Sequence, residues 1–310
     1  MDGARVEEIL SGLLAQNPSI SPKYFYDGLG SRLFEIITLL DEYYPTRTEG
    51  AIMSQYSAEI AKAIGKCDVL LDLGAGNCQK GGALFESLMP VEYRALDISK
   101  EFLEEAIAGL QEKFPQILMT AQEFDLQNSL SFPELATRKK TFFYPGSSIG
   151  NFDPESASNL FRNLAEVCDG MGGLLIGVDL IKPLDVLNKA YNDSLGITAA
   201  FNKNILLNIN RILASNFRLE CWDHYAIFNE ELGCIQMYLR AIEDQMVTWP
   251  GGRRLFKSGE LIHTENSYKY TQEHFESLLI SAGFKSTQSW TDSRQHFLIT
   301  YASFDEGAVN

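Results

Sequence analysis

The feature that most constrains the fold of this chain is an alternation of short apolar runs with amphipathic segments across the middle of the sequence. The apolar runs have the length of β-strands and lie at residues 68–74, 92–98, 117–124, 139–151 and 172–180. Helix-like segments separate them, and the clearest, at 99–114, repeats its apolar residues at the spacing of one helical face. Repeated β-α-β units of this length predict a parallel sheet covered by helices on both faces.

Three helices of this stretch have recognisable limits. The segment 80–88, which follows the first strand, is expected to be one helix. Ser99 precedes the helix after the second strand, where a serine side chain can cap the first turn. Asp153 is followed by Pro154, and an N-cap aspartate with proline at the first helical position is typical of a helix start.

The pattern changes after the fifth strand. Residues 184–214 are predicted to be helical, and residues 217–229 and 234–249 are predicted to form antiparallel strands. The first pattern then returns, with a helix predicted at 271–284 and strands at 286–291 and 296–303. A small domain is therefore expected to interrupt the larger one.

The predicted fold class is α/β, with a doubly wound, mostly parallel, Rossmann-like sheet and a helical lead-in over residues 1–60. The sheet domain is predicted to comprise residues 1–183 and 269–310. An inserted α+β domain, residues 184–268, is predicted to bind the substrate as a lid.

The composition excludes several classes of partner. The 41 acidic and 26 basic residues give a formal net charge of −15, which repels nucleic-acid backbones and anionic membrane surfaces. No apolar run approaches the ~20 residues of a membrane helix. The chain opens with acids where a signal peptide carries bases, so a cytoplasmic location is expected. The protein is also expected to be a monomer. The four histidines are scattered and the five cysteines lack C-x-x-C spacing, so no metal site is predicted and the thiols are expected to be reduced.

The turn after the first strand, "DLGAGNCQKGG", has the pattern of a nucleotide-binding turn. Gly74 and Gly76 allow a tight turn and a close approach to a ligand. Gln79 occupies the position of the third glycine of the dinucleotide fingerprint, which disfavours NAD and FAD. Asp97, at the end of the second strand, can accept hydrogen bonds from ribose hydroxyls. An isolated G-x-G is a plain turn in most proteins, but this combination, and the D-L-G-A-G form of the strand end, favours S-adenosylmethionine.

Two further positions are candidates for substrate contact. Ligands of such sheets gather beyond the carboxyl ends of the strands, which places Asn151, just after the fourth strand, where substrate meets cofactor. In "LIHTENSYKY" (261–270), Glu265 and Ser267 are two apart, so in a strand they share a face, with Thr264 and Asn266 on the other. On spacing alone the pair is as compatible with an exposed strand surface as with a binding site.

Several longer stretches together point to one family. The lead-in contains "SPKYFYDGLGSRLFEIITLLDEYYPTRTE" (21–49), and "GSSIGNFDP", "AYNDSLGITAAFN" and "IHTENSYKY" follow. Over nearly the whole length, the chain resembles the ergothioneine-pathway histidine Nα-methyltransferases, which use S-adenosylmethionine to trimethylate histidine to hercynine. A related fungal branch methylates tryptophan-derived amino acids, so the substrate needs its own argument.

The resemblance implies a cofactor site. Gly74, Lys80 and Asp97 match its cofactor-binding positions, with Asp97 on the ribose. The adenine contact, Asp-Phe in the family, falls on Glu123 and Phe124. Because this glutamate departs from the pattern, Asp125 is a rival for the contact.

The resemblance also implies a substrate site and its catalytic residues. Glu265 and Ser267 match the pair that holds the imidazole ring, and Met237 matches a residue packed beside it. The other matched positions bind the amino-acid end or line the space around the amine: Tyr26, Phe34, Tyr43, Gly146, Asn151 and Tyr191. Tyr26 and Asn151 are the implied catalytic residues.

The chemistry agrees with these roles. Methyl transfer from a sulfonium carbon requires two positioned reactants and a neutral amine. Aromatic walls with few anions lower the pKa of that amine and then accept the methylated cation. Phenylalanine or leucine would leave the imidazole-binding pair unsatisfied. Tryptophan is the serious competitor as substrate, and a non-catalytic cofactor-binding protein and a nicotinamide dehydrogenase are the less favoured alternatives.

Overall fold

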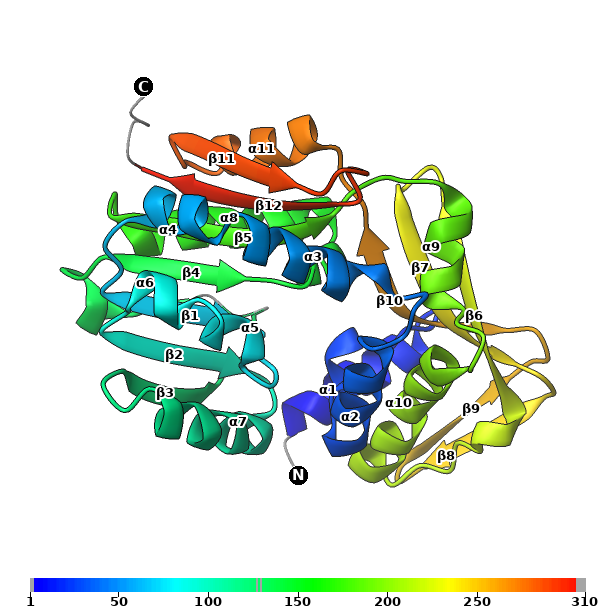
Figure 1. Cartoon of the computed structure of the whole chain (residues 1–310). Helices are drawn as coiled ribbons and strands as arrows, with labels where there is room; N and C mark the ends of the chain where they lie inside the picture. Colours follow the sequence, from blue (N-terminus) through cyan, green and yellow to red (C-terminus); the bar gives the residue numbers. More distant parts are fainter. Residues whose placement is uncertain (1–2, 127, 129, 305–310) are drawn as a thin grey trace. The chain divides into compact units, whose positions relative to one another are not determined.

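The structure, a computed structural model, describes residues 3–126, 128 and 130–304 (Figure 1). The chain forms two compact units. One comprises Pro45–Ile181 and Tyr268–Asn310 and is called the sheet unit below. The other comprises Met1–Tyr44 and Lys182–Ser267 and is called the insert unit.

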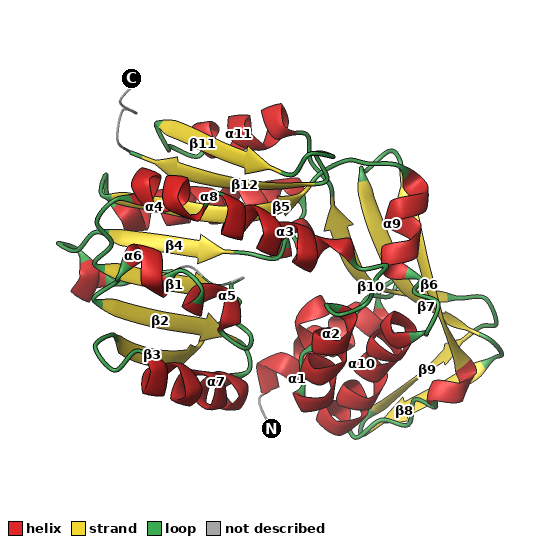
Figure 2. Cartoon of the chain, in the orientation of Figure 1, coloured by secondary structure: helices red, strands yellow, loops and turns green. Residues whose placement is uncertain are grey.

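The sheet unit is built on a seven-stranded sheet of order β11-β12-β5-β4-β1-β2-β3 (Figure 2). Its strands are β1 (Val69–Leu73), β2 (Glu92–Asp97), β3 (Leu118–Glu123), β4 (Lys140–Tyr144), β5 (Gly172–Asp179), β11 (Ser286–Thr291) and β12 (Phe297–Ser303). The five strands from β3 to β5 pair in parallel, whereas β12 runs antiparallel to both β5 and β11. The predicted doubly wound, mostly parallel sheet is confirmed.

Helices cover both faces of this sheet (Figure 1). They are α3 (Tyr44–Gln55), α4 (Ser57–Ile64), α5 (Gln79–Gly82), α6 (Phe85–Leu88), α7 (Lys100–Lys113), α8 (Pro154–Cys168) and α11 (Gln272–Ser281), with 3-10 turns η2 (Pro133–Leu135) and η3 (Ser148–Asn151). All five residues of β1 are buried, as a strand between two helical layers requires.

Of the three predicted helix limits, the cap at Asp153 is confirmed, and the cap at Ser99 and the helix at 80–88 need correction. Asp153 caps α8, and its Oδ1 accepts hydrogen bonds from the backbone N–H of Glu155 and Ser156. Ser99 stands at the start of α7, but its hydroxyl makes no capping bond. The single helix predicted at 80–88 is instead the two short helices α5 and α6, because a Gly-Gly pair is a poor helix former.

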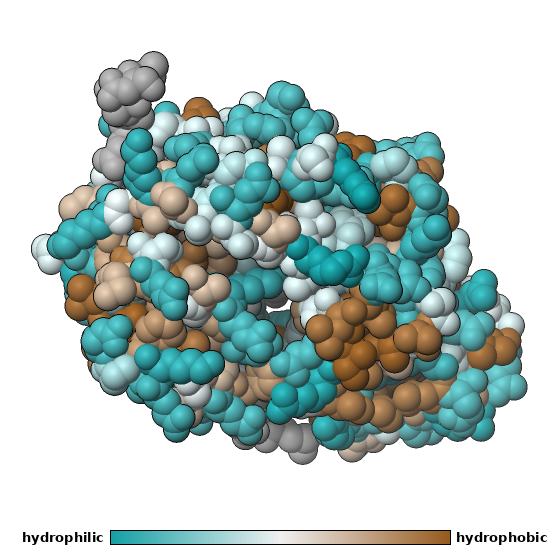
Figure 3. All heavy atoms as spheres, viewed as in Figure 1, coloured by the Kyte–Doolittle hydropathy of each residue, from teal (hydrophilic) through white to brown (hydrophobic). Residues whose placement is uncertain are grey.

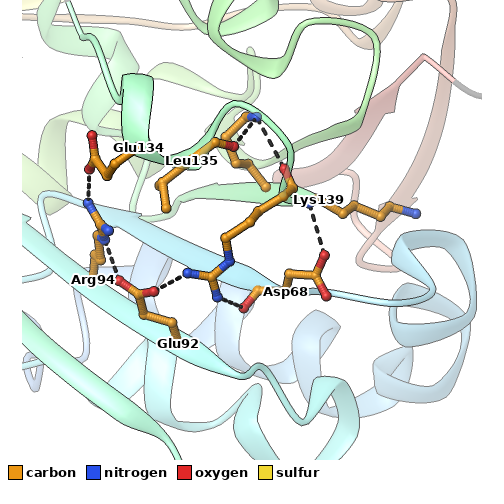
Figure 4. Close-up of polar contacts among 8 residues, drawn as sticks. Asp68, Glu92, Arg94, Glu134, Leu135 and Lys139 are labelled. Carbon is orange, nitrogen blue, oxygen red and sulfur yellow. Dashed lines mark hydrogen bonds and ion pairs between the residues drawn. The ribbon is translucent and has the colours of Figure 1, made fainter.

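A polar network fastens the amino ends of the central strands (Figure 4). Glu92, at the start of β2, accepts hydrogen bonds from Arg94 and Arg138, and Arg94 also donates to Glu134. Asp68 accepts from the backbone N–H of Lys139. Ligands of such sheets bind at the carboxyl ends of the strands. The contacts of this network lie at the opposite edge of the sheet.

The insert unit combines helices with two small sheets. Its helices are α1 (Gly3–Leu14), α2 (Gly28–Ile37), α9 (Leu184–Tyr191) and α10 (Ile197–Leu213), with turns η1 (Pro22–Phe25) and η4 (Leu219–Cys221). One sheet has the order β10-β7-β6, and β8 and β9 form the other. The strands are β6 (Trp222–Asn229), β7 (Cys234–Ala241), β8 (Gln245–Trp249), β9 (Gly252–Phe256) and β10 (Leu261–Tyr268). Strands β6 and β7 pair antiparallel, as predicted.

The predicted domain boundaries are wrong for residues 3–44, which pack with the insert unit and not with the sheet. Phe25 stacks on Phe201 of α10 with ring centroids 4.6 Å apart. Ile9 and Leu13 of α1 belong to the same buried core, which Ile205 of α10 also joins. The physical reason is that the apolar face of α10 needs a cover, and the aromatic-rich lead-in supplies it.

The lead-in also forms part of the surface of this unit. Figure 3 shows apolar side chains gathered over α2 and α10, and Leu29, Ile36 and Leu39 are exposed along α2 and the turn after it. Among the helices that the structure describes, none is long and apolar enough to cross a membrane.

Candidate active site

The glycine turn after β1 has the backbone conformation that its sequence predicts. Gly74 and Gly76 have φ angles of +67° and +54°, in the left-handed region that favours glycine. The backbone N–H of Gly74 donates to the carbonyl of Leu96 at 2.8 Å. The turn is therefore held against the end of β2, beside Asp97.

Asp97 is fixed by backbone donors. Its Oδ2 accepts from the N–H of Gly76 at 3.0 Å, and its Oδ1 accepts from the N–H of Ser99 at 3.1 Å. Burial raises the pKa of this carboxyl, while the backbone hydrogen bonds act in the opposite direction. The carboxylate consequently has a defined orientation at the carboxyl end of β2.

The candidate adenine-binding residues lie at the same edge. Glu123 is opposite Asp97 in the pairing of β2 and β3, and the N–H of Phe124 donates to the carbonyl of Asp97 at 2.8 Å. Glu123 is exposed, whereas Phe124 and Asp125 are partly buried. Both acids remain candidates for the adenine contact.

Lys80 and Gly146 are joined by a residue that the sequence analysis missed. Glu49 of α3 is only 3% exposed; its Oε2 pairs with Nζ of Lys80 at 2.6 Å, and its Oε1 accepts from the N–H of Gly146 at 2.7 Å. A Cβ on Gly177 would lie 2.2 Å from Glu49 Oε1, so this glycine makes room for the carboxylate. Glu49 ties α5, the helix that follows the glycine turn, to the loop after β4.

Asp72 of β1 is a second residue that was missed. It is 1% exposed, and the hydroxyl of Tyr93 donates to its Oδ2 at 2.7 Å. Within the described part of the chain its Oδ1 is buried without a hydrogen-bond partner. Burial raises the pKa of this carboxyl to about 7. A buried carboxylate oxygen of this kind fits a cationic ligand, and S-adenosylmethionine carries a sulfonium and an ammonium group.

The loop after β4 carries Asn151. Gly146 and Ser147 both have left-handed backbone, with φ of +79° and +59°, and Asn151 ends the turn η3 in a partly buried position. Asn151, Gly146 and the predicted cofactor residues thus all belong to the sheet unit. The other predicted substrate residues belong to the insert unit.

In the insert unit, the predicted amine-lining aromatics form one cluster. The ring of Phe34 packs edge-to-face against Tyr26, with centroids 5.8 Å apart, and against Tyr43 at 6.2 Å. Phe201 of α10, which the sequence analysis did not single out, contacts both Tyr26 and Phe34, at 5.7 and 5.9 Å. All three predicted aromatics are partly buried, which leaves part of their surface able to face a ligand.

The predicted imidazole-binding residues are buried on β10. Glu265 is 8% exposed and Ser267 is 5% exposed, and the hydroxyl of Tyr191 donates to Oγ of Ser267 at 2.7 Å. Met237 of β7 is also buried. The reading of Glu265 and Ser267 as an exposed strand surface is therefore wrong.

Both faces of β10 are covered at its centre. Thr264 and Glu265 are consecutive, and both are buried. His263 and Asn266 are partly buried, and their side chains are hydrogen-bonded to each other at 2.9 Å. Because successive residues of a strand point to opposite faces, Thr264 and Glu265 have different neighbours.

A mostly parallel sheet of this order, with a glycine turn after its first strand and a fixed acid at the end of its second, defines an S-adenosylmethionine-dependent methyltransferase. The sequence model of the family described as histidine-specific, S-adenosylmethionine-dependent methyltransferases matches residues 5–304. The chain belongs to this family.

Three relatives illustrate the range of the family. The histidine N-alpha-methyltransferase of Mycolicibacterium smegmatis is 36% identical, covering 95% of this chain and 93% of the relative. Ergothioneine biosynthesis protein 1 of Neurospora crassa is 33% identical over 88% of this chain but only 32% of its own length. An L-tryptophan methyltransferase of Psilocybe serbica is 27% identical, covering 97% of this chain and 93% of the relative.

Proposed function

We propose that this enzyme methylates the α-amino group of L-histidine with S-adenosylmethionine, through the mono- and dimethyl forms to the trimethylated product hercynine, as a step of ergothioneine synthesis. The observation that carries the proposal is the buried carboxylate and hydroxyl of Glu265 and Ser267 on β10, in a chain of a histidine-specific family. The relative in Mycolicibacterium smegmatis supports the substrate, and the one in Neurospora crassa supports the pathway.

Recognition of the side chain follows from the chemistry of imidazole. A neutral imidazole has an N–H on one ring nitrogen and a lone pair on the other. Glu265 accepts from the N–H, and Ser267 donates to the lone pair. A serine hydroxyl accepts and donates at once, so this role is compatible with the hydrogen bond from Tyr191. An apolar side chain would offer neither the donor nor the acceptor that these two residues are proposed to bind, which is a strong basis for rejection.

The amine end of the substrate is assigned to other residues. Asn151, Tyr191, Tyr43 and the backbone at Gly146 bind the α-amino-acid group. The rings of Tyr26 and Phe34 form an aromatic wall around the amine. This wall disfavours the ammonium form before transfer and attracts the methylated cation after it, by about 1–2 kcal/mol for a desolvated cation–π contact.

The cofactor residues are those of the sheet unit. S-adenosylmethionine supplies a methyl group activated on a sulfonium. Asp97 accepts from the ribose hydroxyls, Gly74 allows the close approach of the backbone, and Lys80 lies in α5, the helix that follows the glycine turn. Phe124, with Glu123 or Asp125, is assigned to the adenine.

The test is to incubate the protein with S-adenosylmethionine and each of histidine, tryptophan and phenylalanine, and to record product masses. Mono-, di- and trimethylated histidine are expected, with phenylalanine unchanged. If the enzyme preferred tryptophan in direct competition, tryptophan and not histidine would be its substrate. No methyl uptake by any amino acid would refute the proposed activity.

A further inference from the structure

Behind the predicted imidazole-binding residues lies a polar network centred on His224 of β6. Its Nδ1 is 2.8 Å from Nδ2 of Asn202, and its Nε2 is 2.8 Å from the carbonyl oxygen of Tyr191. His224 is partly buried, and Asn202 is fully buried in α10. The network has no place in the function assigned so far.

The hydrogen bonds fix the tautomer of His224. The amide nitrogen of Asn202 also donates to the carbonyl of Tyr238 at 2.9 Å, which identifies it as the nitrogen end of the amide. Since that nitrogen only donates, Nδ1 of His224 accepts; since the carbonyl of Tyr191 only accepts, Nε2 carries the proton. Burial lowers the pKa of His224, which favours this neutral form.

The network continues to β10 through Thr264. The hydroxyl of Thr264, which is fully buried, lies 2.8 Å from Oδ1 of Asn202 and 3.1 Å from the carbonyl oxygen of Met237. Asn202 thus uses its oxygen and its amide nitrogen to join α10 to β6, β7 and β10. A buried network whose members all have partners rigidifies the groups attached to it.

The groups attached to the network are the predicted substrate residues of the insert unit. His224 holds the backbone of Tyr191, whose side chain holds Ser267. Thr264 holds the backbone of Met237 and directly precedes Glu265 in the chain. The alternation of β10 lets Thr264 bind the network on one face while Glu265 is buried on the other as a candidate ligand.

We propose that the network of His224, Asn202 and Thr264 positions the substrate-binding residues of the insert unit and thereby sets the selectivity for the side chain of the amino acid. This inference rests on the proposed function, because it concerns the same pocket. Discrimination through hydrogen bonds requires the donor and acceptor to be held within about 0.5 Å of the productive geometry. Glu265 and Ser267 would owe that accuracy to residues that do not contact the substrate.

The experiment compares His224→Phe with Thr264→Val, which cut the network at its two ends while keeping a similar side-chain shape. His224→Gln is the conservative variant, since an amide can accept from Asn202 and donate to Tyr191. Ser215→Ala is the control. Ser215 also bonds an asparagine of α10, but this is Asn210, near the other end of that helix.

The measurements are kcat, the KM values for the amino acid and for S-adenosylmethionine, and the melting temperature. Both cutting variants are expected to raise the KM for histidine about tenfold, with the KM for S-adenosylmethionine changed less than about twofold. They should also reduce the preference for histidine over tryptophan. His224→Gln and Ser215→Ala are expected to stay within about threefold of the wild type.

Unchanged KM values in Thr264→Val, or parallel increases for both substrates in every variant that folds, would overturn the positioning role. If His224→Phe does not fold, Thr264→Val alone decides. Assays of the wild-type protein separate the proposed function from the positioning role of the network. If it methylates tryptophan and not histidine, the proposed function fails, and the same variant series on tryptophan still tests the network.

Discussion

The hydroxyl of Tyr191, at the end of α9, donates a 2.7 Å hydrogen bond to Oγ of Ser267 on β10. Both residues are buried, and they are brought together by the fold across a long stretch of sequence. The bond fixes the oxygen of Ser267 and so restricts the direction in which its own proton can be donated. This orientation is what recognition of one particular ring nitrogen requires.

Ser267→Ala is therefore expected to raise the KM for histidine about tenfold, because one hydrogen bond to the ring and the anchor of Tyr191 are both lost. The KM for S-adenosylmethionine should change little. Steady-state kinetics with each substrate varied in turn would measure this. Ser215→Ala is the control, since Ser215 bonds Asn210 at the end of α10; an equal effect in both variants would argue against the role of Ser267.

Glu265→Ala is expected to raise the KM for histidine by a larger factor, about a hundredfold, since a buried charged acceptor is removed from the imidazole N–H. Selectivity against phenylalanine should fall at the same time, because the unsatisfied carboxylate no longer penalises an apolar ring. Competition assays with both amino acids would show this. Glu230→Ala, at an exposed position, serves as the control. Equal increases in KM for histidine and cofactor would contradict the imidazole role.

Glu49→Gln tests the link between Lys80 of α5 and the loop after β4. The amide can still accept from the N–H of Gly146 but loses the charge pair with Lys80. Binding of S-adenosylmethionine, measured by calorimetry, is expected to weaken by about five- to tenfold, because Lys80 is no longer held. Glu59→Gln is a matched control in α4, where Glu59 accepts from Trp290. Unchanged affinity in Glu49→Gln would show that the link does not organise the cofactor site.

The central sheet could be predicted from the sequence because its middle strands, β1, β4 and β5, are buried on both faces, and β1 and β5 read as apolar runs. The glycine turn could be predicted because it needs positive φ angles, which glycine adopts readily. Asp97 could be predicted from its position at the end of the second strand. These are local properties. They depend little on what packs against the segment from elsewhere in the chain.

The failures concern contacts between distant segments. Periodicity shows that α1 and α2 have apolar faces, but not that α10 rather than the sheet covers them. Glu49 and Asp72 resemble ordinary acids in the sequence. Their burial depends on two glycines, Gly177 and Gly81, at which a Cβ would lie 2.2 and 2.3 Å from the two carboxylates. An acid flanked by apolar residues inside a fully buried strand was the available signal for Asp72.

The raised pKa of Asp72 predicts a pH dependence of stability. Its carboxyl has a pKa of about 7 in the folded protein, against an ordinary value of 3.8 that represents the unfolded chain. The folded state therefore binds the proton more tightly. The stabilisation is fully present below about pH 4 and is lost as the pH rises through 7. Asp72→Asn should therefore gain stability relative to the wild type, by on the order of 2 kcal/mol, between pH 5 and 8.

Urea denaturation of the protein without cofactor at several pH values would measure this difference. Asp153→Asn is the control, because hydrogen bonds from Ser156 hold the pKa of Asp153 below 3.8. Its stabilisation is present above that pH and is lost only in more acidic solution, so its effect should be constant from pH 5 to 8. A constant difference for Asp72→Asn as well would mean that Asp72 is ionised throughout.

Lys269 and Asp179 form an ion pair of 3.0 Å in the sheet unit, and both side chains are 0% exposed. Lys269→Met is expected to lower the free energy of unfolding by about 3–5 kcal/mol, because it leaves Asp179 buried without its opposite charge. Lys257→Met is the matched control: Lys257 pairs with Asp244 at 2.8 Å, but both side chains are more than half exposed. That substitution should cost less than about 1 kcal/mol. Urea denaturation would measure both losses. If Lys269→Met lost no more stability than Lys257→Met, water would have to reach Asp179 in the variant, because only a solvated carboxylate tolerates the loss of its partner.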